Sequence, residues 1–472
     1  MTDFPEPSPQ RRPFHWFVYT MLFTFAYMVL MPYFLWRMQR RGGYWSRFAD
    51  RFGILPAKVE DRLRRMHGAV WIHAVSIGEV YVAGQVMRAL RDGATETAFV
   101  LSTTSSTGWT EAEKILAPQD VLIFYPFDFP FSVRRMLDLI RPQAFIFVES
   151  EIWPNMLRYC HHRGVPLFLV NGRISDRSAV GYRLLRRWFG PALCMFSASF
   201  VQSGEDKDRL LAAGADPRRI VVSGNFKFDV ARRAPQKEKL VADFLARHDC
   251  GPDCIVLLGA SIWPGEDTLL IRIYQRLRDR YPALRLVLVP RHFEKADAVQ
   301  AEIEKAGLAC VRKSRVGHVD RHESADNVTL PGKDAARHPV VLGDTTGELM
   351  DFYGNAGIVF VGKSLCEHGG QNMIEPCLCG VATLVGPHTE NFRPVVADLL
   401  AAGALIQVPD AYTLEREIEA LLRDAAARRS LGTRGAAAVR ARRGTVGRCV
   451  DAIKAELATI QARQPNQQDH LI

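Results

Sequence analysis

Apolar runs of strand length alternate along this chain with segments whose apolar residues recur at helical spacing. We predict strands over residues 69–75, 98–102, 144–148, 167–171 and 199–202 and, past residue 229, over 254–259, 284–290, 340–342, 358–361 and 383–385. Helical periodicity marks residues 80–91, 204–211, 265–280 and 293–306. This alternation predicts two α/β domains, each with a parallel sheet and right-handed crossovers.

The predicted boundary between the two domains is a polar segment over 231–239 that contains Pro235. We therefore predict an N-terminal domain over 41–235, a C-terminal domain over 236–460 and a disordered tail over 461–472. Residues 313–337 are polar and aperiodic, which predicts a surface loop. In facing domains of this kind, ligands are expected at the carboxyl ends of the strands, in the cleft between the domains. No dinucleotide fingerprint or P-loop stands in the right context, which disfavours the enzymes that use those motifs.

An apolar segment precedes the first domain. Between residues 14 and 36 only His15 is ionisable, and this length suffices to cross the hydrocarbon layer as a helix. Tryptophan and tyrosine lie towards both ends of the segment, and no small-x-small cleavage site follows it, so residues 1–40 are predicted to be a membrane anchor. Arginines are more numerous after the segment than before it, which predicts that the rest of the chain lies on the cytoplasmic side of the membrane. A helix lying in the membrane plane and a buried core helix remain alternatives.

Composition indicates a globular protein with an anionic partner. The 472 residues carry a formal net charge of +10, with 48% hydrophobic and 24% charged residues. No helix-turn-helix, zinc-finger or RNP pattern is present, so a membrane surface or an anionic ligand is favoured over nucleic acid. The nine cysteines lack metal-ligating spacing and imply no disulfide framework, as in a reduced protein.

Charged residues follow strands in the first half of the chain. Glu79 opens a helix after the first strand, where a carboxylate can act as a general base or can merely favour the positive end of the helix. Glu149 and Glu151 follow another strand on the same side of an extended chain, and Glu151 is the one expected to cap the next helix. Lys227 lies between two phenylalanines, which suits contact with an anionic sugar or phosphate, or ordinary packing with the amine at the surface.

The second half offers candidate phosphate sites. Arg291 follows a strand and suits bidentate recognition of phosphate. A turn over 343–349 and a glycine-rich loop over 369–376 each lead into a helix whose free N–H groups can take an anion, and Glu375 can accept hydrogen bonds from ribose hydroxyls. Glycine loops also simply allow close packing, so each signal is weak alone. Basic and apolar residues over 181–189 predict a helix lying on anionic lipid, or an ordinary amphipathic helix.

Taken together, these segments closely resemble the Kdo (3-deoxy-D-manno-oct-2-ulosonic acid) transferases of Gram-negative bacteria, from the apolar segment to about residue 455. The most specific shared segments are 76–79 (Ser-Ile-Gly-Glu), 149–155 (Glu-Ser-Glu-Ile-Trp-Pro-Asn), 225–229 (Asn-Phe-Lys-Phe-Asp), 289–292 (Val-Pro-Arg-His), 343–348 (Gly-Asp-Thr-Thr-Gly-Glu), 370–375 (Gly-Gln-Asn-Met-Ile-Glu) and 386–388 (Gly-Pro-His). The resemblance implies an inverting GT-B glycosyltransferase that needs no metal and no cofactor. It implies transfer of Kdo from CMP-Kdo, held by the C-terminal domain, to lipid A precursor (lipid IVA), held by the N-terminal domain, in lipopolysaccharide biosynthesis.

By the same resemblance, Glu79 corresponds to the catalytic base, and Glu149 and Lys227 to residues that stabilise the transition state. The positions corresponding to CMP contacts are Pro290, Arg291, Thr346, Gly347, Glu348, Asn372, Met373, Ile374 and Glu375. One departure stands out: where the family has Ser-Thr-His, this chain has Ser-Ile-Trp over 261–263, so a polar contact to the donor is missing or replaced. Residues 206–208 imitate a metal-binding Asp-x-Asp, but they stand where a helix begins and are predicted to cap it.

Two rival interpretations remain at this stage. The nearer is a GT-B transferase that uses a UDP-sugar and a lipid acceptor, which would keep the fold and the base. The other is a membrane-docked sugar-binding protein without activity, which the two carboxylates Glu79 and Glu149 disfavour.

Overall fold

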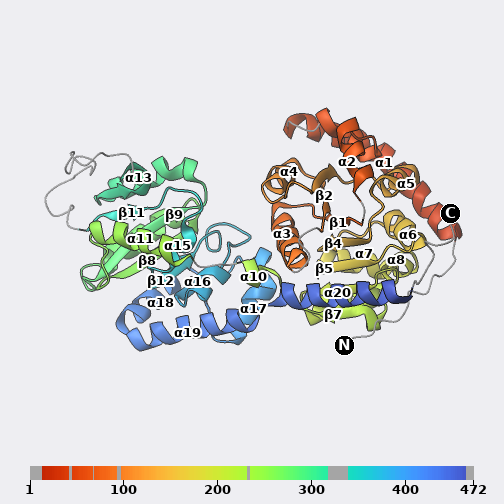
Figure 1. The fold of residues 1–472 in the computed structure, drawn as a ribbon. Helices are drawn as coiled ribbons and strands as arrows, with labels where there is room; N and C mark the ends of the chain where they lie inside the picture. Colours follow the sequence, from red (N-terminus) through yellow and green to blue (C-terminus); the bar gives the residue numbers. More distant parts are fainter. Residues whose placement is uncertain are drawn as a thin grey trace. The chain divides into compact units, whose positions relative to one another are not determined.

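The computed structural model describes residues 13–41, 45–66, 68–92, 97–230, 234–316 and 338–463. The chain forms two compact units, which Figure 1 shows as two sheets with their helices. Unit 1 comprises Met1–Val230 together with Gly444–Ile472, and unit 2 comprises Ala231–Arg443. Each unit is a parallel-sheet α/β domain, as the alternation of strand and helix patterns predicts.

Unit 1 is built on a seven-stranded parallel sheet in the order β3-β2-β1-β4-β5-β6-β7. Its strands are β1 (Val70–His73), β2 (Phe99–Thr103), β3 (Val121–Phe124), β4 (Ala144–Val148), β5 (Leu167–Gly172), β6 (Ala198–Val201) and β7 (Ile220–Val222). Its helices are α1 (Pro13–Arg41), η1 (Trp45–Phe52), α2 (Ala57–Arg65), α3 (Ile77–Arg91), α4 (Ser106–Glu113), α5 (Pro130–Ile140), α6 (Pro154–His162), α7 (Asp176–Leu184), α8 (Arg186–Leu193), α9 (Gly204–Ala213), η2 (Pro217–Arg219), α10 (Lys227–Val230) and α20 (Thr445–Arg463).

Both faces of this sheet are buried, which is why its strands read as continuous apolar runs. Trp71 belongs to one core cluster, with residues of α5, α6 and α9. Its neighbours Val70 and Ile72 point to the other face and pack in a second cluster with residues of α3 and α20. Trp71 and Ile72 have no exposed surface, so the sheet is covered at its centre on both sides.

Unit 2 repeats this architecture with the order β10-β11-β9-β8-β12-β13-β14, again all parallel. Its strands are β8 (Ile255–Ile262), β9 (Leu284–Pro290), β10 (Cys310–Arg312), β11 (Val340–Leu342), β12 (Ile358–Val361), β13 (Ala382–Val385) and β14 (Ile406–Gln407). Its helices are α11 (Pro235–Arg247), α12 (Glu266–Leu277), η3 (Phe293–Lys295), α13 (Ala296–Lys305), α14 (Lys313–Val316), α15 (Leu349–Tyr353), α16 (Ile374–Leu378), η5 (Glu390–Phe392), α17 (Arg393–Ala401), α18 (Ala411–Arg423) and α19 (Ala425–Ala441). Apolar residues of α12, α13 and α18 cover one face of the sheet.

The end of the chain differs from the predicted domain limits. Residues 444–460 were expected in the C-terminal domain, but α20 packs in unit 1, where Val450 and Ile453 join the core cluster of α3 (Figure 1). Asp229 accepts hydrogen bonds from the N–H groups of Gly444 (2.6 Å) and Val446 (2.7 Å) and so fixes the start of α20. The amphipathic pattern of this helix shows that it covers a core but not which core it covers.

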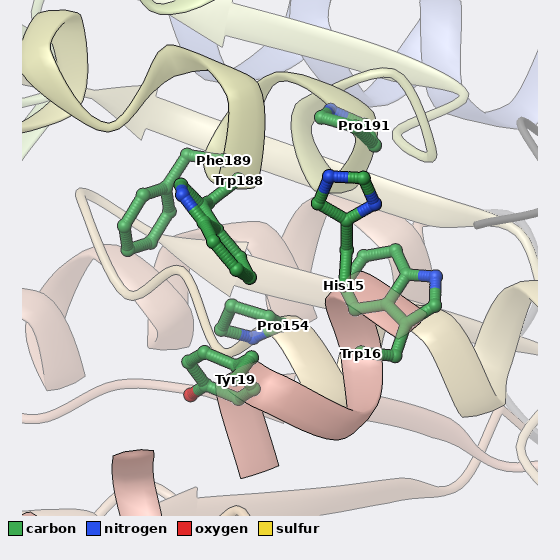
Figure 2. Close-up of a pocket in the computed structure, with 7 residues that line it drawn as sticks. All are labelled: His15, Trp16, Tyr19, Pro154, Trp188, Phe189 and Pro191. Carbon is green, nitrogen blue, oxygen red and sulfur yellow. The ribbon is translucent and has the colours of Figure 1, made fainter. Parts of the chain in front are cut away.

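Helix α1 packs along unit 1 with one side and exposes apolar residues on the other. Tyr19 donates to Asp128 (2.9 Å), and the ring of Phe23 lies 5.2 Å from that of Phe129. Figure 2 shows three residues of α1 around a small apolar pocket, which is lined by His15, Trp16, Tyr19, Pro154, Trp188, Phe189 and Pro191. The exposed apolar residues of α1 include Phe17, Met21, Leu22, Phe25, Met28 and Val29. Within the described chain, His15–Tyr33 is the one stretch long and apolar enough to cross a membrane.

Residues 181–189 do not form the single basic helix that the pattern predicts. The chain turns at Leu185 (φ −97°, ψ 21°), which separates α7 from α8. The rings of Trp188 and Phe189 line the pocket at α1, while Leu184 is 76% exposed. The loop predicted over 313–337 begins with the short helix α14, and the tail predicted over 461–472 begins with the last residues of α20, so both predictions are wrong at these residues. The rest of both segments, 317–337 and 464–472, lies outside the described residues.

Candidate functional site

Glu79 lies in the first turn of α3, directly after β1, where it forms a capping box with Ser76. Its carboxylate accepts hydrogen bonds from the N–H of Val75 (2.8 Å) and from the hydroxyl of Ser76 (2.8 Å). Burial raises the pKa of Glu79, while these hydrogen bonds favour its charged form. Glu79 therefore does stabilise the start of α3, which was the alternative interpretation of its position in the sequence. A carboxylate has more acceptor positions than these bonds use, so it can still accept a proton.

Glu149 stands at the carboxyl end of β4 in a left-handed backbone conformation, with φ at 64°. A non-glycine residue in this region is uncommon and costs energy, and such residues cluster at functional sites. Four charged groups act on its side chain, those of Glu79, Glu151, Lys227 and Arg173. Burial raises its pKa to about 7, and the negative charge of Glu79 adds to the rise, while Lys227 and Arg173 oppose it.

Lys227 begins the one-turn helix α10, which is fixed at both ends. The side chain of Asn225 accepts from the N–H of Lys227 (2.9 Å), and Asp229 bonds the start of α20. Phe226 has no exposed surface and Phe228 is 2% exposed, so the flanking rings are core residues. Burial lowers the pKa of Lys227, and the charge of Glu149 opposes that shift. The structure thus brings Glu79, Glu149 and Lys227 together.

A polar network that the sequence analysis missed holds this group in place. Asn171, at the end of β5 with φ at 53°, donates weakly to Glu149 (3.5 Å) and accepts from the N–H of Phe226 (3.0 Å). Gln202 donates to the backbone of Asn171 (3.0 Å) and accepts from Asn225 (2.8 Å). The polar residues that end the apolar run at Asn171 were a usable signal, because they share a sheet edge with Glu149.

Glu151 was expected to cap α6, and this expectation is wrong. Helix α6 starts at Pro154, which has no N–H group that needs an acceptor, and Trp153 at its N-cap makes no side-chain cap. Glu151 instead accepts from the indole of Trp153 (2.8 Å) and lies 4.0 Å from Nε2 of His73. Burial lowers the pKa of His73 to about 3, so that ring is neutral at physiological pH.

The capping role predicted for residues 206–208 belongs instead to Ser203, and Asp206 lies in the first turn of α9. The hydroxyl of Ser203, the N-cap of α9, accepts from the N–H of Asp206 (3.1 Å) and donates to its carboxylate (2.6 Å). The same carboxylate accepts from the N–H of Ile174 (2.8 Å). Asp206 is therefore occupied by local hydrogen bonds.

In unit 2, the predicted CMP contacts lie after β9, β11 and β12, at the carboxyl edge of one sheet. Pro290 ends β9 and is buried, and Arg291 is exposed. Burial raises the pKa of Glu375, while the amide of Asn372 and the charge of Arg291 oppose that rise. The structure therefore brings Arg291 near Glu375.

The loop into α16 leaves few side chains for a ligand. Met373 and Ile374 have no exposed surface, so only their backbone atoms are available. Asn372 accepts from the N–H of Ile374 (3.0 Å) and donates to Glu375 (3.0 Å). That N–H group is therefore already bonded, contrary to the simple expectation of free donors at this helix start.

The turn at Thr346 to Glu348 follows β11, the neighbour of β9. Gly347 has φ at 83°, which the turn requires of it. Glu348 pairs with Lys313 (2.5 Å), a residue that the sequence analysis did not single out, and with the hydroxyl of Thr345.

The segment that departs from the family pattern lies beside these residues. Ser261 has φ at 51°, and the carbonyl of Ile262 accepts from the N–H of Arg291 (3.1 Å). The Trp263 ring lies 4.4 Å from the ammonium group of Lys363 and 5.5 Å from the ring of His292. Trp263 thus adds an aromatic surface next to Arg291.

Comparison with known proteins decides the family. Residues 46–230 match the family model described as 3-deoxy-D-manno-octulosonic-acid transferase, and 335–438 match glycosyl transferases group 1. The 3-deoxy-D-manno-octulosonic acid transferase of Bordetella pertussis is 33% identical over 446 residues, covering 92% of this chain and 98% of that protein. The chain belongs to the Kdo transferase family. The Haemophilus influenzae member is 31% identical, covering 82% of this chain and 86% of its own.

This Kdo transferase family member also has the GT-B glycosyltransferase fold. The UDP-GlcNAc 2-epimerase of Neisseria meningitidis aligns with a TM-score of 0.52 at 15% identity, covering 83% of this chain and 100% of that chain. A glycosyltransferase of Rickettsia africae aligns with a TM-score of 0.51 at 13% identity, covering 83% and 99%. At these identities the likeness concerns the fold alone.

Proposed function

We propose that this enzyme transfers Kdo from CMP-Kdo to a hydroxyl group of lipid A precursor (lipid IVA), with inversion at the anomeric carbon and without a metal ion. Family membership supports the sugar and the reaction class. The observation that carries the mechanism is the joint burial of Glu79, Glu149 and Lys227 at the carboxyl edge of the unit 1 sheet.

In this proposal Glu79 is the general base. The acceptor hydroxyl attacks the anomeric carbon directly and loses its proton to the Glu79 carboxylate, which gives inversion in a single displacement. Hydrogen bonds from Val75 and Ser76 hold the carboxylate in one orientation. Lys227 supplies a positive charge for the Kdo carboxylate, and Asn171 holds Glu149 in place beside it.

The donor is assigned to unit 2. Arg291 is exposed beside Glu375 and is suited to the phosphate of CMP, because a guanidinium binds phosphate oxygens through two donors. Glu375 and Asn372 are suited to ribose hydroxyls. Pro290, Thr346, Gly347, Glu348, Met373 and Ile374 complete the proposed CMP contacts, the last two through backbone atoms. The leaving CMP is stabilised by the guanidinium of Arg291 rather than by a metal ion.

We further propose that α1 lies in the interface of the inner membrane, on its cytoplasmic side, instead of spanning it. One side of α1 is occupied by unit 1 from Trp16 to Tyr27, including a hydrogen bond from Tyr19 to the buried carboxyl group of Asp128. A spanning helix would draw this polar contact into the hydrocarbon, where it is costly. An interfacial helix instead buries its free apolar side in the outer part of the bilayer.

Two measurements test the reaction. Mass spectrometry of tetra-acylated lipid A precursor incubated with CMP-Kdo should show a mass increase corresponding to Kdo, with undiminished turnover in the presence of a chelator. CMP should raise the melting temperature and UDP should not, because only a bound ligand stabilises the folded state. A shift with UDP alone would favour a UDP-sugar donor. Inhibition by the chelator that a divalent ion reverses would contradict metal independence.

A further inference from the structure

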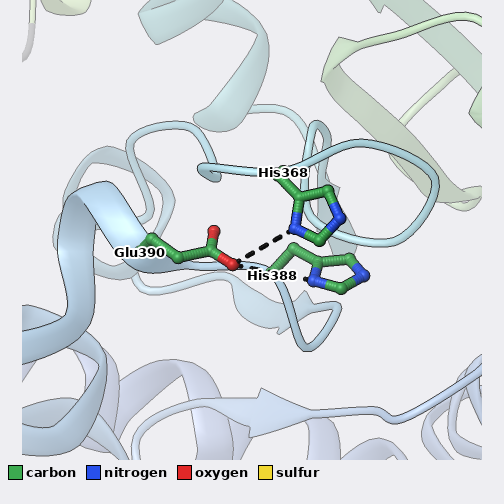
Figure 3. Close-up of side chains that lie close together, drawn as sticks. All are labelled: His368, His388 and Glu390. Atoms are coloured by element: carbon green, nitrogen blue, oxygen red, sulfur yellow. Dashed lines mark hydrogen bonds and ion pairs between the residues drawn. The ribbon is translucent and has the colours of Figure 1, made fainter.

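Two imidazoles and a carboxylate converge in unit 2, outside the residues assigned to Kdo transfer. His368 lies in the loop between β12 and α16, His388 lies in the loop after β13, and Glu390 begins η5 at the end of that loop. Strands β12 and β13 are parallel neighbours, so the two loops leave the same edge of the sheet. Figure 3 shows both rings directed at the same oxygen of Glu390.

The three side chains are spaced as ligands of one ion. Nδ1 of His368 lies 3.3 Å and Nδ1 of His388 lies 3.7 Å from Oε1 of Glu390, and one ligand atom from each residue falls within 4.8 Å of the others. Ligand atoms at tetrahedral distances of about 2.0–2.2 Å from zinc are about 3.3–3.6 Å apart. The two measured distances are close to that range. His368 has a side chain that is 74% exposed and can rotate to close the remaining gap.

The backbone around the three residues is held in place before any ion binds. The second carboxylate oxygen of Glu390 accepts from the N–H of Gly369 (2.7 Å). The N–H of His388 donates to Ser364 (2.9 Å), and the N–H of Asn391 donates to Gly369 (3.0 Å). A partner that fixes the non-coordinating atom of a ligand is the usual support of a metal site.

We propose that His368, His388 and Glu390 bind a divalent transition-metal ion of the zinc class. Two nitrogen ligands and one oxygen ligand suit Zn²⁺, Co²⁺ or Ni²⁺, whereas Mg²⁺ and Ca²⁺ prefer oxygen ligands throughout. With neutral rings, one carboxylate leaves a net charge of +1 on the bound ion. Since the side chains are exposed to 74%, 32% and 44%, a fourth position is open to water or to an anionic ligand.

An ordinary surface ion pair does not account for this arrangement equally well. His292 and Glu294 form such a pair at 3.9 Å, and that pair has one imidazole. Here two rings share one carboxylate oxygen, with ring centroids 3.9 Å apart. Two imidazolium charges so close would repel each other, whereas two neutral rings are what an ion requires.

A bound ion would join the loop over 363–372 to the loop over 386–391. The first loop is further closed by a hydrogen bond from Gly370 to Lys363 (2.8 Å) and ends at Asn372, next to Glu375. The ion would restrain the motion of the loop over 363–372 and take no part in sugar transfer. The site itself does not depend on the proposed reaction, because its ligands are separate from the transfer residues.

The test uses full-length protein without a histidine tag, freed of metal by dialysis. Co²⁺ is titrated by visible absorption and Zn²⁺ by calorimetry, on wild type and on His368→Ala, His388→Ala and Glu390→Gln. We expect one ion per chain in wild type, the intense absorption of low-coordinate Co²⁺, and an affinity at least about tenfold lower in each variant. His162→Ala, which removes one of two adjacent histidines on α6, should bind as wild type does.

Three results would overturn the site: no saturable binding to wild type, unchanged binding in the ligand variants, or equal loss in His162→Ala. Hydrogen exchange separately tests whether the bound ion restrains the loop over 363–372. Zn²⁺ should slow exchange of the N–H groups of Gly369 and Gly370 in wild type but not in His368→Ala. Binding without such slowing would leave a metal site and remove its effect on the loop.

Discussion

At the scale of single residues, Glu79 combines a structural and a chemical role, and one substitution separates them. In Glu79→Gln the amide cannot accept the proton of the acceptor hydroxyl, so kcat should fall by about 10²–10⁴-fold. The amide also cannot replace both acceptor oxygens of the capping box with Val75 and Ser76. The variant should therefore lose about 0.5–2 kcal/mol of stability as well. Transfer assays and thermal unfolding of the same samples measure the two effects.

Asp206→Asn is the matched control for Glu79→Gln. Asp206 is likewise a buried carboxylate in the first turn of a helix, bonded to its N-cap serine and to a backbone N–H group. Its substitution should cost similar stability and leave kcat near the wild-type value. If Glu79→Gln keeps more than a tenth of the wild-type kcat, Glu79 is not the general base and only stabilises the start of α3. Glu149 would then become the leading candidate for the base.

Glu149 should make the stability of the protein depend on pH. Its pKa is raised from 4.5 to about 7 in the folded chain, so between these values the folded state binds more protons than the unfolded state. Its contribution to stability is therefore complete below about pH 4.5 and is lost as the pH rises to about 7. Glu149→Gln is neutral throughout. The melting temperature of wild type relative to this variant should fall across that range, and a relative rise would contradict the assignment.

Substitution of Arg291 should weaken donor binding and leave the stability of the fold unchanged. Its side chain is exposed, and loss of a charged hydrogen bond to phosphate costs about 1.5–3 kcal/mol, so Arg291→Ala should weaken CMP binding by that amount. Calorimetry with CMP measures the change. Arg276→Ala, which removes a surface pair with Glu415, should bind CMP as wild type does. Equal affinities of wild type and Arg291→Ala would remove Arg291 from the proposed site.

The sequence located charged residues better than it located their partners. Glu79, Glu149 and Lys227 were found because each follows an apolar run or interrupts aromatic residues. Asn171 and Lys313 were missed because their importance lies in contacts with residues far along the chain, Phe226 and Glu348. The error at Glu151 has a local origin, since its carboxylate accepts from the indole of Trp153, two residues along the chain, and makes no cap at α6.

At the scale of elements, the sequence predicted the inner strands and missed the outer ones. Strands β4, β9, β11 and β12 have the predicted limits, whereas β3, β7, β10 and β14 were not predicted, and these are the outermost strands of the two sheets. Strands β7 and β14 are short and partly exposed, so they lack a continuous apolar run. The four residues of β3 form a fully buried apolar run, so the sequence pattern could have predicted this strand.

Helix α1 provides the prediction at this scale. Charges introduced at Met21, Phe25 and Met28, which are 57%, 68% and 64% exposed, should release the protein from membranes without changing its melting temperature. In a variant whose nine native cysteines are replaced by serine or alanine, a cysteine placed at Thr2 should resist a membrane-impermeant thiol reagent in intact spheroplasts and react after lysis. Labelling in intact spheroplasts would show that the helix spans the membrane.

At the scale of the whole molecule, the two units do not follow one another along the chain, because unit 2 is inserted between the two segments of unit 1. The boundary expected over 231–239 lies close to the observed one at Val230, but the return of the chain at Gly444 was not predicted. Unit 2 is therefore one continuous segment, and unit 1 is made of two.

The segment 231–443 should fold alone and bind CMP within about a factor of ten, or 1.4 kcal/mol, of the full-length affinity. It contains its own core cluster and every proposed CMP contact, and the core of α20 lies elsewhere. Circular dichroism, thermal unfolding and calorimetry check this, with the Arg291→Ala fragment as control. A fragment that unfolds cooperatively yet fails to bind CMP would show that the donor needs residues of unit 1.

By contrast, the fragment 1–230 alone should unfold readily, because the face of α3 that Val450 and Ile453 cover would be exposed to water. Joining 444–463 to it through a flexible linker should restore a cooperative transition.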